Sequence, residues 1–123
     1  MTTRRLMYSG TAVRLIYGLM SLFIPRTLFK LSGNPVEAEP RYFNALFGGR
    51  DLSVCAATAH AVNAGRERDA LLLNLSCEAT DLVALLQEAR ERGGLDQTLV
   101  AAIAFNTFGW ATWLTAWRRL DAS

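Results

Sequence analysis

The sequence predicts an all-α fold, namely a four-helix transmembrane bundle in up-down-up-down order. Residues 97–117 form an uncharged stretch long enough to cross a bilayer. Clusters of turn-forming residues divide the 123-residue chain into four segments of similar size, and no segment alternates apolar and polar residues as a half-buried strand does. Short connections favour antiparallel neighbours, so we expect one domain over residues 1–123.

Composition leaves the choice between a soluble and a membrane bundle open. Hydrophobic residues make up 51% of the chain and its mean hydropathy is +0.16, which is high for a soluble domain and low for a polytopic membrane protein. The net charge is only +2 and the basic residues are scattered, so nucleic acid is not an expected partner. Cys55 and Cys77 lie in apolar segments without a Cys-x-x-Cys pattern, which predicts buried thiols and no disulfide.

The first two helices are expected within residues 5–25 and 42–65. In the first, Arg14 is the only charge between its ends, and it interrupts what would otherwise resemble a signal peptide. No clean small-x-small cleavage site follows, so we interpret this segment as a retained helix. The second segment carries Arg50 and Asp51 as its only charges.

The third and fourth helices are expected within residues 70–87 and 97–117. The third is rich in leucine yet carries Glu78 and Asp81. The fourth has 21 residues without a charge and places Trp113 and Trp117 near one end, where aromatic side chains anchor a span at the membrane interface. Only this segment would pass a strict hydropathy test by itself.

The connectors between these segments are PRTLFKLSGNPVEAEPR, GRERD and RERGGLD. Together with the four apolar segments, they predict a multi-pass membrane protein, which in a bacterium is a protein of the inner (plasma) membrane. With both termini cytoplasmic, six basic residues face the cytoplasm against five on the other side, so this orientation is favoured by one residue. The first set is Arg4, Arg5, Arg66, Arg68, Arg118 and Arg119, and the second is Arg26, Lys30, Arg41, Arg90 and Arg92.

Each predicted helix carries a minority of polar residues on one face. At about 100° per residue, the i, i+4, i+7 spacing of Asn74, Glu78 and Asp81 brings them onto one side of the third helix. An ionised side chain at the centre of a bilayer costs about 2.5–3.5 kcal/mol, so we expect these faces to turn inward. Glu78 and Asp81 are then expected to pair with Arg14 or Arg50.

These inward faces predict a polar pocket. Glu78, Asp81 and Asp51 are the candidates for acid/base catalysis, because neighbouring carboxylates repel and one keeps its proton. No metal site or cofactor is expected, since the sequence has one histidine, no Glu-x-x-His repeat and no glycine-rich phosphate loop. The residues expected to bind a substrate are Arg14, Tyr17, Arg50, His60, Asn74, Asn106 and Trp110.

Structural roles compete with each of these assignments. Arg14 and Arg50 need counter-charges in any membrane bundle, and Asp51 also suits the start of a helix. A lone histidine beside alanines, as His60 is, is more often a hydrogen-bonded core residue. The three tryptophans of the last helix are typical of an interfacial belt, in which Trp110 lies deepest.

Residues 42–86 combine a Gly-Arg-Asp-Leu motif, a basic turn and an aspartate in the third helix, namely Gly49, Arg50, Asp51 and Leu52, Arg66 and Arg68, and Asp81. This pattern resembles a family of small four-helix bacterial membrane proteins, often actinobacterial, of unknown function. The resemblance implies four helices and an integral membrane location, and it implies no activity. The second helix departs from it: His60 and Asn63 stand where leucines and glycines are expected, which favours a pocket.

Three functions fit these observations. The first is a cofactor-independent isomerase or cyclase that uses acid/base chemistry, such as isomerisation, cyclisation or epoxide opening, on a lipophilic small molecule. The second is a non-catalytic accessory or assembly subunit of a larger membrane complex. The third is a proton or small-ion carrier, which would need a homo-oligomer. Membrane lipid is an expected partner in all three, and a soluble four-helix bundle is the alternative fold.

Overall fold

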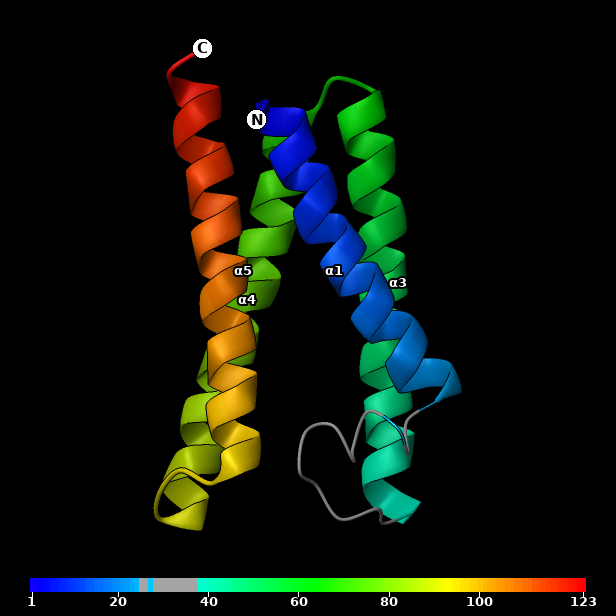
Figure 1. Ribbon diagram of the computed structural model, residues 1–123, viewed down its shortest axis with the longest axis vertical. Helices are drawn as coiled ribbons and strands as arrows, with labels where there is room; N and C mark the ends of the chain where they lie inside the picture. The colour runs from blue at the N-terminus through cyan, green and yellow to red at the C-terminus, as the bar shows by residue number, and fades with distance from the viewer. Residues whose placement is uncertain (25–26, 28–37) are drawn as a thin grey trace.

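The computed structural model describes residues 1–24, 27 and 38–123 (Figure 1). In this part of the chain the fold is all-α, with four long helices and no strand, as the sequence predicts. The helices are α1 (Thr3–Phe23), α3 (Ala38–Asn63), α4 (Glu67–Arg92) and α5 (Gln97–Asp121). Both termini lie at the same end of the molecule, and consecutive helices run in opposite directions (Figure 1). The up-down-up-down order is therefore confirmed.

Local signals at the helix ends fix where the chain turns. Thr2 caps α1 by accepting a hydrogen bond from the Arg5 N–H, and Asp96 caps α5 by accepting one from the Leu99 N–H at 2.9 Å. After α4, Gly93 adopts φ 73°, the left-handed conformation that ends helices. The helices extend past the apolar segments seen in the sequence, because the flanking Glu and Arg residues are themselves good helix formers.

The four helices form two pairs. The most extensive contact joins α1 to α3, the next joins α4 to α5, and smaller contacts join the pairs to each other. Figure 1 shows the pairs close together at the end that holds the termini and diverging toward the other end. A Cβ at Gly48 would lie 2.8 Å from the carbonyl oxygen of Gly18, so α1 and α3 pack backbone against backbone at this crossing.

The apolar core lies toward the end where the pairs meet. Gly10 makes room for the Trp113 ring, since a Cβ there would lie 2.9 Å from it. Trp113 is only 2% exposed. The buried residues of this core are Met7, Ala61, Val62, Ala70, Leu71, Trp113 and Ala116. Below this core the pairs separate, and the space between them is the setting of the site.

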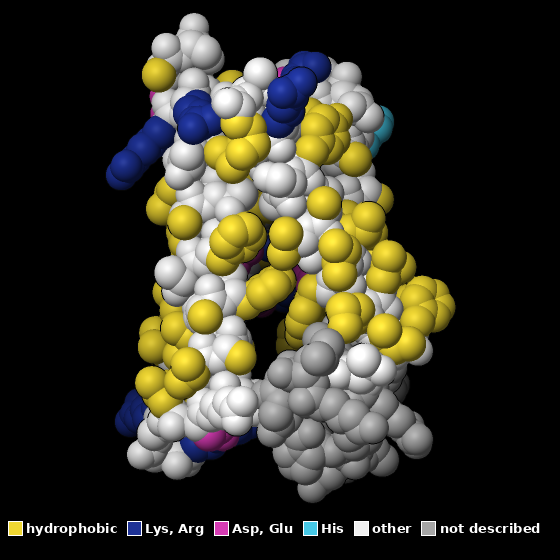
Figure 2. Space-filling model, viewed as in Figure 1, with side chains coloured by type: hydrophobic (Ala, Val, Ile, Leu, Met, Phe, Trp, Pro, Cys, Tyr) yellow, Lys and Arg dark blue, Asp and Glu magenta, His cyan; other side chains and the backbone are white. Residues whose placement is uncertain are grey.

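The outer surface is apolar at mid-height. Within residues 8–24, 46–59, 72–87 and 100–117 no exposed side chain is Lys, Arg, Asp or Glu, and many exposed side chains are large and hydrophobic. Figure 2 shows hydrophobic side chains along the middle of one face and charged ones near its ends. Among the described helices, α1 and α5 are long and apolar enough to cross a membrane. That the four helices cross a membrane stays a prediction.

Candidate functional site

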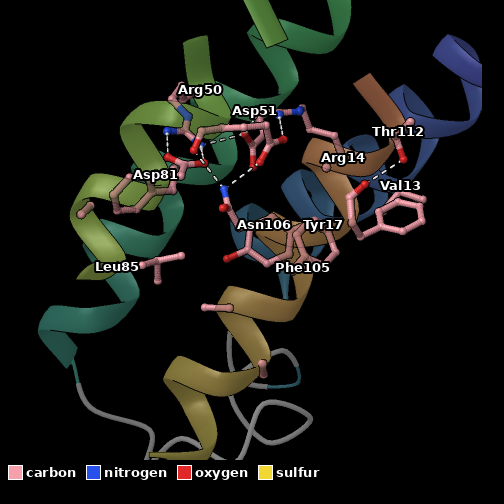
Figure 3. A pocket seen from close by; sticks show the side chains of 18 of the residues that line it. Val13, Arg14, Tyr17, Arg50, Asp51, Asp81, Leu85, Phe105, Asn106 and Thr112 are labelled. Carbon is pink, nitrogen blue, oxygen red and sulfur yellow. Dashed lines mark hydrogen bonds and ion pairs between the residues drawn. The ribbon is translucent and has the colours of Figure 1, made fainter. Parts of the chain in front are cut away.

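Five charged side chains from three helices form one continuous network of ion pairs, the ion-pair network (Figure 3). Arg14 of α1 donates to Asp51 of α3 at 3.1 Å and to Glu78 of α4 at 2.6 Å. Arg50 of α3 donates to both carboxylate oxygens of Asp81 of α4, at 2.7 and 3.1 Å, and to Asp51 at 3.1 Å. Positive and negative groups therefore alternate from Glu78 to Asp81, with Asp51 shared at the centre.

The fourth helix contributes an amide to this network. The Nδ2 atom of Asn106 donates to Glu78 Oε2 at 2.9 Å and to the Glu78 main-chain carbonyl at 3.0 Å. Because a carbonyl can only accept, the second bond fixes which end of the amide faces Glu78. Gly109 lies against the same carboxylate, since a Cβ there would come within 2.4 Å of Glu78 Oε1. All four helices thus position the site.

Burial differs across the ion-pair network. The side chains of Arg14, Asp51 and Glu78 are 8%, 6% and 9% exposed, whereas those of Arg50 and Asp81 are 34% and 30% exposed. Buried charges are tolerated only when paired and hydrogen-bonded, and the inner three residues meet that condition. The prediction that the acids turn inward to pair with Arg14 and Arg50 is confirmed.

The pairing leaves one negative charge in excess. With all groups ionised, three carboxylates stand against two guanidinium groups, 3 − 2 = 1. Both carboxylate oxygens of Glu78 and both of Asp81 accept hydrogen bonds, and Asp51 Oδ1 accepts two. Asp51 Oδ2 accepts none from any residue that the structure describes. The excess charge is therefore shared by the whole ion-pair network, and its free oxygen is Asp51 Oδ2.

The ion-pair network forms the polar end of a cavity of about 700 Å³. The rest of the cavity wall is mainly apolar and aromatic, with the rings of Tyr17 and Phe105 5.3 Å apart. Figure 2 shows an opening on the face of the molecule, framed by hydrophobic side chains, with acidic side chains in its depth. A cavity of this size and lining is typical of a site for a lipophilic small molecule.

Seven of the ten residues proposed from the sequence line this cavity. They are Arg14, Tyr17, Arg50, Asp51, Glu78, Asp81 and Asn106. Their roles in catalysis or binding stay predictions.

Three of the proposed residues do not line the cavity, namely Asn74, His60 and Trp110. Asn74 is 1% exposed and donates to Thr58 Oγ1 and the Ala70 carbonyl, both at 2.8 Å, so its amide joins α3 to α4. His60 is exposed. It follows the buried Thr58 by two residues, and residues two apart in a helix point to nearly opposite faces. Asn63 is exposed too and accepts a hydrogen bond from Tyr8, so the expectation that His60 and Asn63 contribute to the pocket is wrong.

Trp113, and not Trp110, forms the indole wall of the cavity. Trp110 is half-buried, and its Nε1 has no hydrogen-bond partner among the described residues. Gly10 and Gly109 also line the cavity and were not proposed. The i, i+3, i+7 spacing of Asn106, Gly109 and Trp113 is the sequence signal that places these three on one face of α5.

The chemistry of the site comes from carboxylates and guanidinium groups. Cys55 and Cys77 are free thiols. Cys55 is buried, as predicted, and its thiol lies against the Thr11 carbonyl, whereas Cys77 is only half-buried. Among the described residues, no group of three or more His, Cys, Asp and Glu side chains is arranged to hold a metal ion.

Comparison with family models, curated proteins and solved structures gave no match to this chain. The resemblance seen in residues 42–86 therefore stays a prediction.

Proposed function

We propose that this protein crosses the bacterial inner membrane with all four helices and performs acid/base chemistry on a lipophilic small molecule in its internal cavity. The reactions that fit are isomerisation, cyclisation and epoxide opening, none of which needs a cofactor. The observation that carries the proposal is the ion-pair network, with one carboxylate in excess, in a cavity whose remaining wall is mainly apolar.

The distribution of polarity supports the membrane part of the proposal. A soluble bundle helix usually carries a narrow apolar stripe on a polar rod, whereas here the polar residues are the inward minority and the exposed middle is apolar. Because lipid cannot solvate charges, they gather inside. The end with the termini carries six arginines against five basic residues predicted at the other end, so we propose that the termini are cytoplasmic.

The excess carboxylate supports the chemical part. An unpaired negative charge in a low-dielectric cavity binds a proton when the cavity holds no cation. Asp51 Oδ2 is the oxygen that accepts no hydrogen bond from the described residues, so we propose that the proton reaches the substrate at this atom, while Arg14 and Arg50 hold the other oxygen of Asp51 in place. Asp51 then donates this proton to the substrate, and the cation that forms is stabilised by the carboxylate left behind.

The same network supplies a base to complete the reaction. Asp81 is partly exposed and lines the cavity, so it takes a proton from a second position of the substrate. In an isomerisation the substrate gains one proton and loses one, so the network regains its starting charge when Asp81 takes the second proton, and solvent then carries a proton back to Asp51. Glu78, fixed by Arg14 and Asn106, is in this account a positioning residue.

A second function is favoured by a different observation. The four Nη atoms of Arg14 and Arg50 all donate to carboxylates inside the protein, as they would in a network that only holds helices together. Polar contacts between helices are a principal source of association in lipid. On this account the protein is an accessory or assembly subunit of a larger membrane complex.

Deuterium incorporation tests the enzyme proposal without a known substrate. Purified protein is incubated with bacterial lipid extract in D₂O, and the extract is examined by mass spectrometry for carbon-bound deuterium. We expect incorporation with the wild type and with Glu91→Gln, an exposed carboxylate outside the cavity. Asp51→Asn should lower it by about 10²–10⁴-fold, the usual contribution of a general acid.

The outcomes separate the two functions. If Asp51→Asn folds, as judged by helical circular dichroism, and incorporates as much deuterium as the wild type, the acid/base proposal is wrong. If the wild type incorporates none and instead copurifies with a fixed partner after mild detergent extraction, the subunit function replaces it.

A further inference from the structure

The charge balance of the cavity identifies the class of molecule that it holds. We propose that the cavity binds single-chain amphiphiles with a cationic head group, with the head beside Asp51 and the chain along the apolar wall. This inference rests on the proposed function, because the cation that forms when the network protonates a substrate lies at the same place. A ligand that already carries the positive charge takes the place of the proton.

A bound cation would make the ion-pair network electrically neutral. The ion-pair network has three carboxylates and two guanidinium groups, and a bound ammonium group would make the positive and negative charges equal. In a cavity bordered by lipid, an uncompensated charge is costly and a matching charge on the ligand is favourable. Asp51 Oδ2, with no hydrogen bond from the described residues, is where an N–H donor or a quaternary ammonium would lie.

The guanidinium groups of Arg14 and Arg50 already bind the three carboxylates of the ion-pair network, which disfavours an anionic ligand. An anionic head group is usually held by guanidinium N–H groups, but the Nη atoms of Arg14 and Arg50 donate to the three carboxylates. The Nε atom of Arg50 is unpaired but fully covered, so a ligand cannot reach it. A phosphate or sulfate would therefore add to the negative excess and would have to compete with the three carboxylates for the Nη atoms.

The aromatic side chains in the cavity wall also favour a cationic ligand. Tyr17, Phe105 and Trp113 line the cavity, and the faces of aromatic rings attract cations. The Tyr17 and Phe105 side chains lie together beside the charged groups (Figure 3), with ring centroids 5.3 Å apart. The described residues already include two such contacts: the Arg50 guanidinium lies 5.2 Å from the centre of the Phe47 ring, and the Arg68 guanidinium lies 5.8 Å from that of Trp117.

The opening of the cavity accounts for the chain of the ligand. Ile16, Phe105 and Phe108 line the cavity and are also 59%, 45% and 50% exposed on the outer surface. A hydrocarbon chain that leaves the charged end therefore passes along apolar side chains that continue onto the outside of the bundle. An amphiphile that enters sideways from the lipid fits this arrangement.

Trp113 provides a reporter inside the cavity. In the variant Trp110→Phe/Trp117→Phe it is the one remaining tryptophan of the chain. The protein in dodecyl maltoside is titrated with three chain-brominated probes, dodecyltrimethylammonium, dodecyl sulfate and dodecanol, and quenching of Trp113 is measured. We expect half-maximal quenching by the cation at about tenfold lower mole fraction than by the alcohol, and the weakest quenching by the sulfate.

Variants of Asp51 and of Glu91 test whether the preference for the cationic probe arises at Asp51. Asp51→Asn in the same background should remove the advantage of the cation over the alcohol, and Glu91→Gln, which removes a charge outside the cavity, should keep it. If Asp51→Asn does not fold, the order of the three probes on the unsubstituted network decides. Equal or stronger quenching by the sulfate or the alcohol would overturn the inference.

Failure here is distinguishable from failure of the proposed function. Deuterium incorporation without a preference for the cation would leave an acid/base enzyme whose ligand is neutral or anionic. A clear preference for the cation without any deuterium incorporation would leave a binding protein for cationic amphiphiles.

Discussion

Arg14 is the counter-charge that Asp51 and Glu78 share, and it is one of the most completely buried charges of the molecule. Its substitution tests how far the three residues depend on one another. Arg14→Met should destabilise the protein by about 3–5 kcal/mol, because two buried carboxylates lose their partner. We expect reduced accumulation in membranes and a lower midpoint of thermal unfolding in detergent.

A double variant separates charge from packing at this position. Arg14→Met/Glu78→Met removes both members of a pair, so its destabilisation should be smaller than the sum of the two single substitutions. Strictly additive effects on the unfolding midpoint would mean that Arg14 and Glu78 do not stabilise one another, and the ion-pair network would lose its physical basis.

The residues of the site could be predicted from the sequence where charge alone decides. Arg14, Arg50, Asp51, Glu78 and Asp81 had to turn inward in any bundle with an apolar exterior, and they do. His60 and Trp110 are less strongly constrained. A neutral ring is tolerated on either side of a helix, so its direction depends on how the helix is rotated against its neighbours, which periodicity alone does not give.

At the scale of helices, the crossing of α1 and α3 depends on two glycines. Gly48→Ala should weaken this pair by about 1–3 kcal/mol, the range for overpacking, because the added Cβ would meet the Gly18 carbonyl at 2.8 Å. Gly49→Ala is the matched control on the same helix, since nothing lies within 4 Å of a Cβ there. Equal thermal unfolding midpoints for the two variants would contradict the close crossing.

The turn before α5 contributes a pH-dependent cap. The hydrogen bond from the Leu99 N–H lowers the pKa of Asp96 below its ordinary value, and the hydrogen bond from Arg92 is the next largest cause. A carboxylate whose pKa is lower in the folded than in the unfolded state stabilises the fold at pH values above the unfolded pKa of about 3.9. This stabilisation is lost as the pH falls through the folded-state pKa. Hydrogen exchange in the first turn of α5 should therefore accelerate on acidification in the wild type.

Asp96→Asn is the control for this cap, because asparagine keeps the capping oxygen and does not titrate. Its first-turn exchange, corrected for the intrinsic dependence on pH, should show no such acceleration. The same acceleration in both proteins would assign the effect to another group.

The helices themselves could be predicted better than their ends. Breaker clusters place the turns after α3 and α4, where Gly65 and Gly93 both have φ 73°. By contrast, α3 begins at Ala38, inside the stretch interpreted as a connector, and α4 continues to Arg92. Hydrophobicity marks where a helix is buried, and the backbone hydrogen bonds continue as long as the next residues permit. Most of the predicted long connector lies outside the described residues.

At the scale of the molecule, the cavity arises because two helix pairs meet at one end and separate toward the other (Figure 1). Trp113 and the other core residues join the pairs, and the ion-pair network joins them again below the core. The sequence predicts four antiparallel helices with inward polar faces. It does not predict the separation, because that depends on where Gly10, Gly18 and Gly48 allow close approach and where bulky side chains prevent it.

The central claim is that lipid surrounds the middle of this molecule, and spin labels measure that directly. Single cysteines replace Val83 and Leu114, apolar and exposed at mid-height, and Glu91, exposed at one end, in a background of Cys55→Ala/Cys77→Ala. After labelling and reconstitution in bilayers, power saturation compares collision with oxygen and with nickel-EDDA. The account predicts labels at positions 83 and 114 that meet oxygen but not nickel-EDDA, and the reverse at 91. Free access of nickel-EDDA to positions 83 and 114 would contradict it.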